Sequence, residues 1–172
     1  LLDVDDNVWT EESGKAKAPR VLKNDYKLIP GREYVKDPTV YVEEGSEVCI
    51  VFVLIYIPDS INAVMLNNDD YSIEKQVGKT WHRLADNRVA QVEGGKYLLF
   101  GQLDGTAGSV LPLFDNIAIR PEATSEELEK AEREEIVITA YAIQSEGFED
   151  ASADDLWTDI LVKKFDPFGT NP

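Results

Sequence analysis

Residues 48–57 form an uninterrupted run of ten apolar positions, the longest in the chain. Valine and isoleucine dominate it, and such a run without polar positions is typical of a strand buried on both faces. Just before it, Val40 and Val42 alternate with Thr39 and Tyr41, which is the pattern of a half-buried strand. We therefore expect residues 48–57 to be a central strand of a β-sheet.

Residues 135–144 show the second strong strand pattern. One face would carry Ile136, Ile138, Ala140 and Ala142, and the other Val137, Thr139, Tyr141 and Ile143.

Weaker patterns predict three more strands. Alternation around Trp81 predicts a strand over residues 79–84, continued by residues 89–92. A glycine pair at positions 94 and 95 predicts a turn before a strand at 97–100. Residues 111–119, which include a proline, predict an edge strand or an irregular one.

One helix is expected, over residues 125–134, because Thr124 and Glu127 form a capping box at its start. Residues 59–70 read as a polar connection and residues 101–108 as a loop. Residues 153–162 predict one helical turn followed by a last strand.

These elements predict a single domain over residues 1–172, with an N-terminal arm at 1–18 and a flexible tail at 166–172. The expected fold class is all-β, a jelly-roll-like antiparallel β-sandwich with one or two short surface helices. An immunoglobulin-like sandwich is the second choice, since a single cysteine excludes its disulfide.

Charge and cysteine content narrow the functional classes. Seventeen basic and 33 acidic residues give a net charge of −16, which disfavours nucleic acid and anionic membranes as partners. The run 48–57 has about half the length of a membrane-spanning helix, so no membrane span is predicted. Cys49, the only cysteine, excludes an internal disulfide and a cysteine zinc site, and we expect a small buried apolar side chain there.

Catalytic motifs are scarce. His82 is the only histidine, and the chain has no H-E-x-x-H, G-x-S-x-G or P-loop motif. We expect an ordinary exposed strand residue at His82 and predict no catalytic residue, cofactor site or metal site. A hydrolase that uses a carboxylate pair stays open as an alternative.

Two further patterns point to ligands. Asp3, Asp5 and Asn7 match the first ligand positions of an EF-hand loop, but Val8 and Gly14 break the motif. A second acidic group consists of Glu149, Asp150, Asp154 and Asp155, and for both groups a solvated acidic surface is the preferred interpretation. Sugar rings could stack on five aromatic side chains if these were exposed on one face of a sheet: Trp9, Tyr71, Trp81, Tyr97 and Trp157. We expect most of them to be core or half-buried strand residues instead.

Several segments resemble a known family. They are residues 24–31 (N-D-Y-K-L-I-P-G), 36–40 (K-D-P-T-V), 45–47 (G-S-E) before the apolar run, 136–148, and Leu156-Trp157. Together they are similar to exported proteins of Gram-positive bacteria with a SipW-dependent type of signal peptide, the TasA/camelysin-like family. The chain begins at Leu1, so we expect a mature or trimmed form.

The resemblance implies a secreted, extracellular or cell-surface protein with a jelly-roll-like fold. In TasA-like members it implies a subunit of biofilm-matrix fibres, in which an N-terminal segment completes the sheet of the next subunit. The metallopeptidase activity attributed to camelysin is a weaker alternative, because the chain has no recognisable zinc motif. A cell-surface adhesin or glycan-binding module is the other alternative.

Self-assembly also agrees with the physics of a β-sheet protein. An open sheet edge accepts an added strand, and residues 1–9 could supply one. The charge of −16 opposes association. We therefore expect lower pH or added salt to promote assembly, and deletion of residues 1–9 to reduce it.

Overall fold

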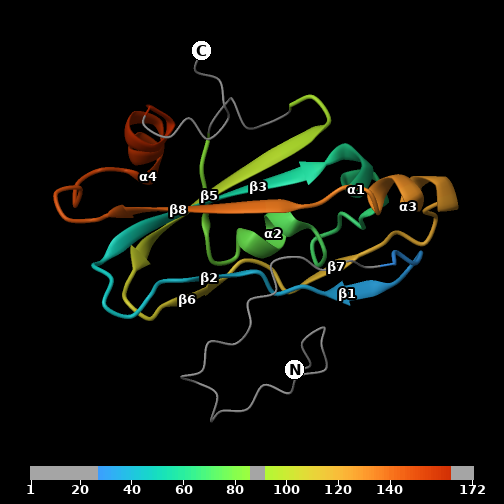
Figure 1. Cartoon of the computed structure of the whole chain (residues 1–172), viewed down its shortest axis with the longest axis horizontal. Helices are drawn as coiled ribbons and strands as arrows, with labels where there is room; N and C mark the ends of the chain where they lie inside the picture. The colour runs from blue at the N-terminus through green and yellow to red at the C-terminus, as the bar shows by residue number, and fades with distance from the viewer. Residues whose placement is uncertain (1–26, 86–91, 164–172) are drawn as a thin grey trace, which may run out of the picture.

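The computed structural model describes residues 27–85 and 92–163. Its main sheet is antiparallel and has the strand order β4-β5-β3-β8 (Figure 1). The strands are β4 (His82–Arg83), β5 (Gly95–Gly105), β3 (Cys49–Pro58) and β8 (Val137–Gln144). The predicted arm at 1–18, the predicted strand positions 89–91 and the tail at 166–172 lie outside the described residues.

Strand β3 is the centre of the fold. Val53 lies opposite Phe100 of β5 and Ala140 of β8. Alternate side chains of β3 enter two different cores, with Val53 in the larger and Phe52 in the smaller, and both are fully buried. The prediction of a central strand buried on both faces is confirmed.

The second layer is a two-stranded ribbon made of residues 33–41 and 110–118. Its parts are β1 (Glu33–Val35) paired with β7 (Asn116–Ala118), and β2 (Thr39–Tyr41) paired with β6 (Val110–Pro112). Both pairs share one register, because Glu33 lies opposite Ala118 and Thr39 opposite Pro112, six residues further along each strand. Two hydrogen bonds join the pairs, from Lys36 N–H to the Asp115 carbonyl (2.8 Å) and from Leu113 N–H to the Pro38 carbonyl (2.9 Å).

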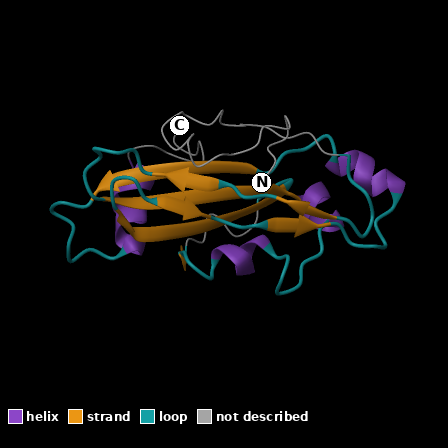
Figure 2. Ribbon diagram, turned by 90° about the horizontal axis from the view of Figure 1, so that it is seen from below, coloured by secondary structure: helices purple, strands orange, loops and turns teal. Residues whose placement is uncertain are grey.

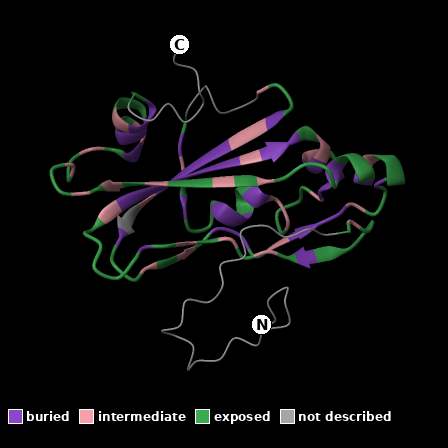
Figure 3. Ribbon diagram, in the orientation of Figure 1, coloured by how far each residue is buried: buried purple, intermediate pink, exposed green. Residues whose placement is uncertain are grey.

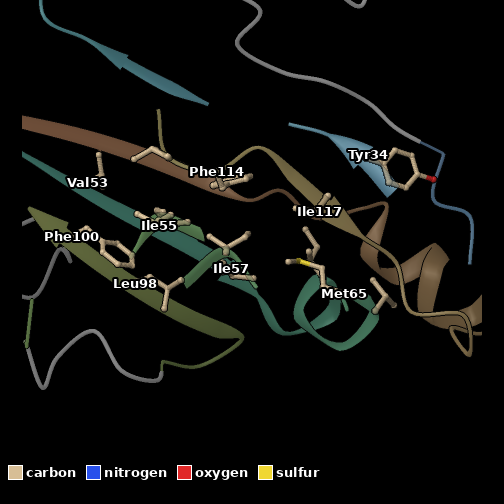
Figure 4. Close-up of a cluster of buried hydrophobic side chains, with 14 of the residues drawn as sticks. Tyr34, Val53, Ile55, Ile57, Met65, Leu98, Phe100, Phe114 and Ile117 are labelled. Atoms are coloured by element: carbon tan, nitrogen blue, oxygen red, sulfur yellow. The ribbon is translucent and has the colours of Figure 1, made fainter. Parts of the chain in front are cut away.

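The ribbon covers one face of the main sheet (Figure 2). Between the two layers lies the larger core, to which the sheet contributes Val53, Ile55, Ile57, Leu98 and Phe100, and the ribbon contributes Tyr34, Phe114 and Ile117 (Figure 4). Helices α1 (Asp59–Val64) and α2 (Ile73–Val77) add apolar side chains to this core.

Buried Gln76 of α2 closes one edge of the ribbon. Its Nε2 donates to the Asn116 carbonyl (2.9 Å), and its Oε1 accepts from the backbone N–H groups of Asp115 (3.0 Å) and Asn116 (3.3 Å). Trp81 Nε1 donates to the Pro112 carbonyl (2.9 Å), and Leu66 N–H to the Ala118 carbonyl (2.8 Å). Buried backbone groups need such partners, so these contacts replace a third strand at this edge.

The opposite face of the main sheet is covered by the segment 153–162. It consists of α4 (Ala153–Leu156) followed by a π-helix, η2 (Trp157–Val162). The Trp157 ring lies 5.8 Å from that of Phe52 and 6.0 Å from that of Tyr141. The predicted last strand is therefore wrong. Ser152 caps the segment by accepting from Asp155 N–H, and this favours a helix.

Three other predictions need correction. Residues 59–70 are not simply a connection, because Ile61 and Val64, three positions apart, bury one face of α1. Residues 101–108 are not all loop, since β5 continues to Gly105 beside β3. Within 79–84 only His82 and Arg83 form a strand, and 111–119 contains the end of β6 and all of β7.

Helix α3 (Ser125–Ala131) has the predicted capping box, with both of its reciprocal hydrogen bonds present. Ile138 of β8 packs on the larger core, whereas Tyr141 and Ile143 pack on the smaller one, so the predicted two faces of this strand are confirmed. The described part of the chain is mainly β, with antiparallel strand pairs and a few short helices.

Candidate functional site

The side chains singled out for chemistry do not converge in the described part of the chain. His82 is exposed on β4. Cys49 is half-buried, with its Sγ 3.4 Å from the Gly105 carbonyl. Burial raises the pKa of the Cys49 thiol, so the reactive thiolate is disfavoured.

Trp81 and Trp157 are too deeply buried to form a sugar-stacking platform. Trp81 and Trp157 are only 4% and 1% exposed, and both belong to the cores. Tyr71 is half-buried and its hydroxyl donates to Glu33 Oε2 (3.1 Å), which raises the pKa of Tyr71. Tyr97 is half-buried beside Tyr56, with their ring centres 5.0 Å apart. Trp9 lies outside the described residues.

Three residues of the second acidic group, Glu149, Asp154 and Asp155, accept hydrogen bonds within the fold. Glu149 Oε1 accepts from Gly147 N–H (3.0 Å), and backbone hydrogen bonds lower the pKa of Glu149. Asp154 Oδ1 accepts from Ala85 N–H (3.1 Å) and Asp155 Oδ2 from the Ser152 hydroxyl (2.7 Å). Among the described residues no group of three or more His, Cys, Asp or Glu side chains could hold a metal ion. Asp3, Asp5 and Asn7 lie outside these residues.

A hollow beside α2 has a volume of about 110 Å³ and is lined by Gln76, Lys79, Thr80, Pro112, Leu113, Phe114 and Asp115. Ligand clefts are commonly at least ~300 Å³. This hollow is therefore too small for an ordinary metabolite.

The outer edge of β8 is the most distinctive surface. Ser145 N–H donates to the Val48 carbonyl (2.9 Å), so this residue pair is of the hydrogen-bonded type. Hydrogen-bonded and non-hydrogen-bonded residue pairs alternate along an antiparallel ladder. In the non-hydrogen-bonded pairs, the N–H and C=O groups of the β8 residue point away from β3. The outward groups belong to Ile138, Ala140, Ala142 and Gln144. No strand in the described ranges pairs with this side of β8.

Strand β8 lacks the sequence features that protect many edge strands. Its eight residues, V-I-T-A-Y-A-I-Q, contain no charge and no proline. Most of them are exposed along the strand, with Val137 at 48% (Figure 3). Natural edge strands are commonly short, charged, bulged or covered, because a bare edge accepts another strand.

The β1–β2 edge of the ribbon, which pairs with no other strand in the described ranges, lies on the same flank. Trp81, next to β4, contacts the β6 side of the ribbon, whereas β4 and β8 are the opposite ends of the main sheet. The β1–β2 side of the ribbon therefore lies on the β8 flank (Figure 4). Two large apolar side chains are exposed on this part of the ribbon, Val35 at 66% and Tyr41 at 43%.

Sequence reasoning predicted the strand at 135–144 but not its position at an edge. The available signal was composition, since Thr139, Ala140, Ala142 and Gln144 make β8 less apolar than β3. No protein-family model matches the chain, and searches of curated proteins and of solved structures find no match either. Among the described residues no helix has the length and apolar character needed to cross a membrane.

Proposed function

We propose that the chain is an extracellular structural protein, a TasA-like subunit of a biofilm matrix or surface fibre without catalytic activity. Its copies join when a strand from one copy adds to the open sheet edge of another. The observation that carries this proposal is the uncharged outer edge of β8, which pairs with no strand in the described part of the chain.

The edge offers enough backbone groups for specific binding. Its four outward residues present four N–H donors and four C=O acceptors to an added strand. Each hydrogen bond contributes about 0.5–1.5 kcal/mol net. Side chains on alternate positions of the added strand could also pack on Ile138 and on the apolar ribbon.

The family resemblance supports the same function. Residues 24–31 and 136–148 carry it and are similar to exported TasA/camelysin-like proteins, and this similarity supports a location outside the cell. In this proposal the complete fold is a jelly-roll-like sandwich. Neither the main sheet nor the ribbon pairs with a further described strand on the β8 flank, which is compatible with strand addition there.

A proline at position 140 tests the role of the edge. The Ala140 N–H points away from β3, so Ala140→Pro removes an outward donor without breaking the β3–β8 ladder. We expect the unmodified protein to form fibres at reduced pH or in added salt, as seen by electron microscopy, and Ala140→Pro to form few. Ala140→Ser is the matched control and should assemble normally.

Deletion of residues 1–9 tests the donor. Fewer fibres after this deletion would support the N-terminal arm as the added strand. If Ala140→Pro assembles as well as the unmodified chain, or if no condition produces fibres, the proposed function is wrong.

A further inference from the structure

Both ends of the open β8 edge are acidic. Glu134 and Glu135 precede the strand, and Glu146, Glu149 and Asp150 follow it. The turn before β3 lies at the second end, because Ser145 is hydrogen-bonded to Val48. This turn adds Glu43, Glu44 and Glu47, and all eight carboxylates belong to exposed residues.

The segments that supply these eight carboxylates contain no basic residue. Residues 38–57 and 134–150 contain neither lysine nor arginine, and the nearest base in the sequence is Arg133. The edge therefore combines an uncharged middle of eight residues with negative charge at each end. Exposed charges act over about 10 Å at moderate salt, so they influence a segment that lies along the edge.

We infer that this edge selects its partner by charge, and that its preferred occupant is an extended segment with lysine or arginine at both ends and an uncharged middle. The inference rests on the proposed function, since it specifies which strands can add to β8. Eight residues of strand span about 27 Å, which fixes the spacing of the basic ends. The chain's own residues 1–12 carry five acids and no base, so they are poor occupants at neutral pH and low salt.

Two synthetic peptides test the charge preference on the full chain. Both have the same Thr-Val repeat of eight residues, and one has two lysines at each end where the other has two glutamates. We expect the lysine-ended peptide to bind at least about 10-fold more tightly in fluorescence anisotropy at low salt, with most of the difference lost in about 0.5 M NaCl. A peptide of residues 1–12 should behave like the glutamate-ended one.

Two variants separate strand addition from general attraction to an acidic surface. Ala140→Pro should weaken binding of the lysine-ended peptide about 10-fold, because the substitution removes a backbone N–H donor while the charges of the protein stay unchanged. The triple variant Glu47→Lys, Glu134→Lys, Glu146→Lys should lose or reverse the preference. Its control, Asp69→Lys, Asp70→Lys, Glu122→Lys, has the same net charge and should keep it.

Equal binding of the two peptides, or an effect of equal size in both triple variants, would overturn the charge selection. Unchanged binding to Ala140→Pro would show that the peptide does not add to the edge. If the lysine-ended peptide binds more tightly but the protein forms no fibres, the proposed fibre function is wrong, whereas the β8 edge is still a peptide-binding site. If fibres depend on Ala140 but the peptides bind equally, only the charge selection fails.

Discussion

At the scale of single residues, Gly105 is one of two glycines of β5, with Gly95, at which a Cβ atom would lie less than 3.0 Å from neighbouring atoms. A Cβ atom at this position would lie 2.6 Å from the Cys49 carbonyl oxygen and 2.8 Å from its Sγ. The β3–β5 register shifts between Cys49 and Val51, so the backbones approach closely at an irregular point of the ladder. A side chain there has no space without movement of β3.

Gly105→Ala should therefore destabilise the fold by about 1–3 kcal/mol, measured as the free energy of unfolding in urea. Gly101→Ala on the same strand is the control, because its Cβ would make only ordinary contacts at 3.5 Å with Leu84 and Phe52. That control should change the free energy by less than about 0.5 kcal/mol. Equal effects would show that the close approach at Gly105 does not limit stability.

At the scale of elements, α3 is stabilised by its own first turn. Glu127 Oε2 accepts from Thr124 N–H (2.8 Å) and from the Thr124 hydroxyl (2.9 Å), and Thr124 Oγ1 accepts from Glu127 N–H (3.3 Å). The bond from the Thr124 backbone, with the other contacts from Thr124 and Arg120, lowers the pKa of Glu127 below its ordinary 4.5.

This pKa shift predicts how Glu127→Gln depends on pH. A carboxylate with a lowered folded-state pKa stabilises the fold above its ordinary pKa, and the contribution is lost as pH falls through the lowered value. Glu127→Gln should therefore have a lower urea midpoint than the unmodified chain at about pH 7, and the difference should vanish as pH falls below the lowered pKa of Glu127. Glu129→Gln, on an exposed position of α3, is the control; a pH-independent loss in Glu127→Gln would contradict the explanation.

The helical segment 153–162 depends on Trp157 for its attachment to the sheet. Trp157 is 1% exposed and packs against Phe52 and Tyr141. Trp157→Ala should cost about 3–5 kcal/mol in the free energy of unfolding. Exposed Thr158→Ala should cost less than about 0.5 kcal/mol, and a similarly small loss in Trp157→Ala would show that the segment covers the sheet only loosely.

At the scale of the whole molecule, a net charge of −16 opposes association of copies. Salt screens exposed charges beyond about 10 Å at 0.1 M, so light scattering should detect faster assembly as NaCl rises from about 0.02 to 0.5 M. The assembly rate of Ala140→Pro should increase little over the same range of NaCl concentration. Faster assembly at the lowest salt would mean that charge repulsion does not control this step.

The elements predicted from sequence were those with strong local signals. The apolar run at 48–57, the two-sided pattern at 135–144 and the Thr124–Glu127 cap each lie within a short segment, and all three are present. The segment 153–162 misled because its apolar positions suit a strand as well as a helix. In the structure the segment is helical, and its Trp157 packs on Phe52 and Tyr141 of the main sheet.

By itself, the sequence determined the strand character of β3 and β8, the start of α3 and the acidic charge, because these depend on neighbouring residues or on composition. Tertiary structure decided which edges are closed. Gln76 closes one edge of the ribbon through Asn116, 40 positions away, while β8 pairs with no strand other than β3 among residues 27–85 and 92–163. Its open edge follows from contacts between distant segments, which no local pattern specifies.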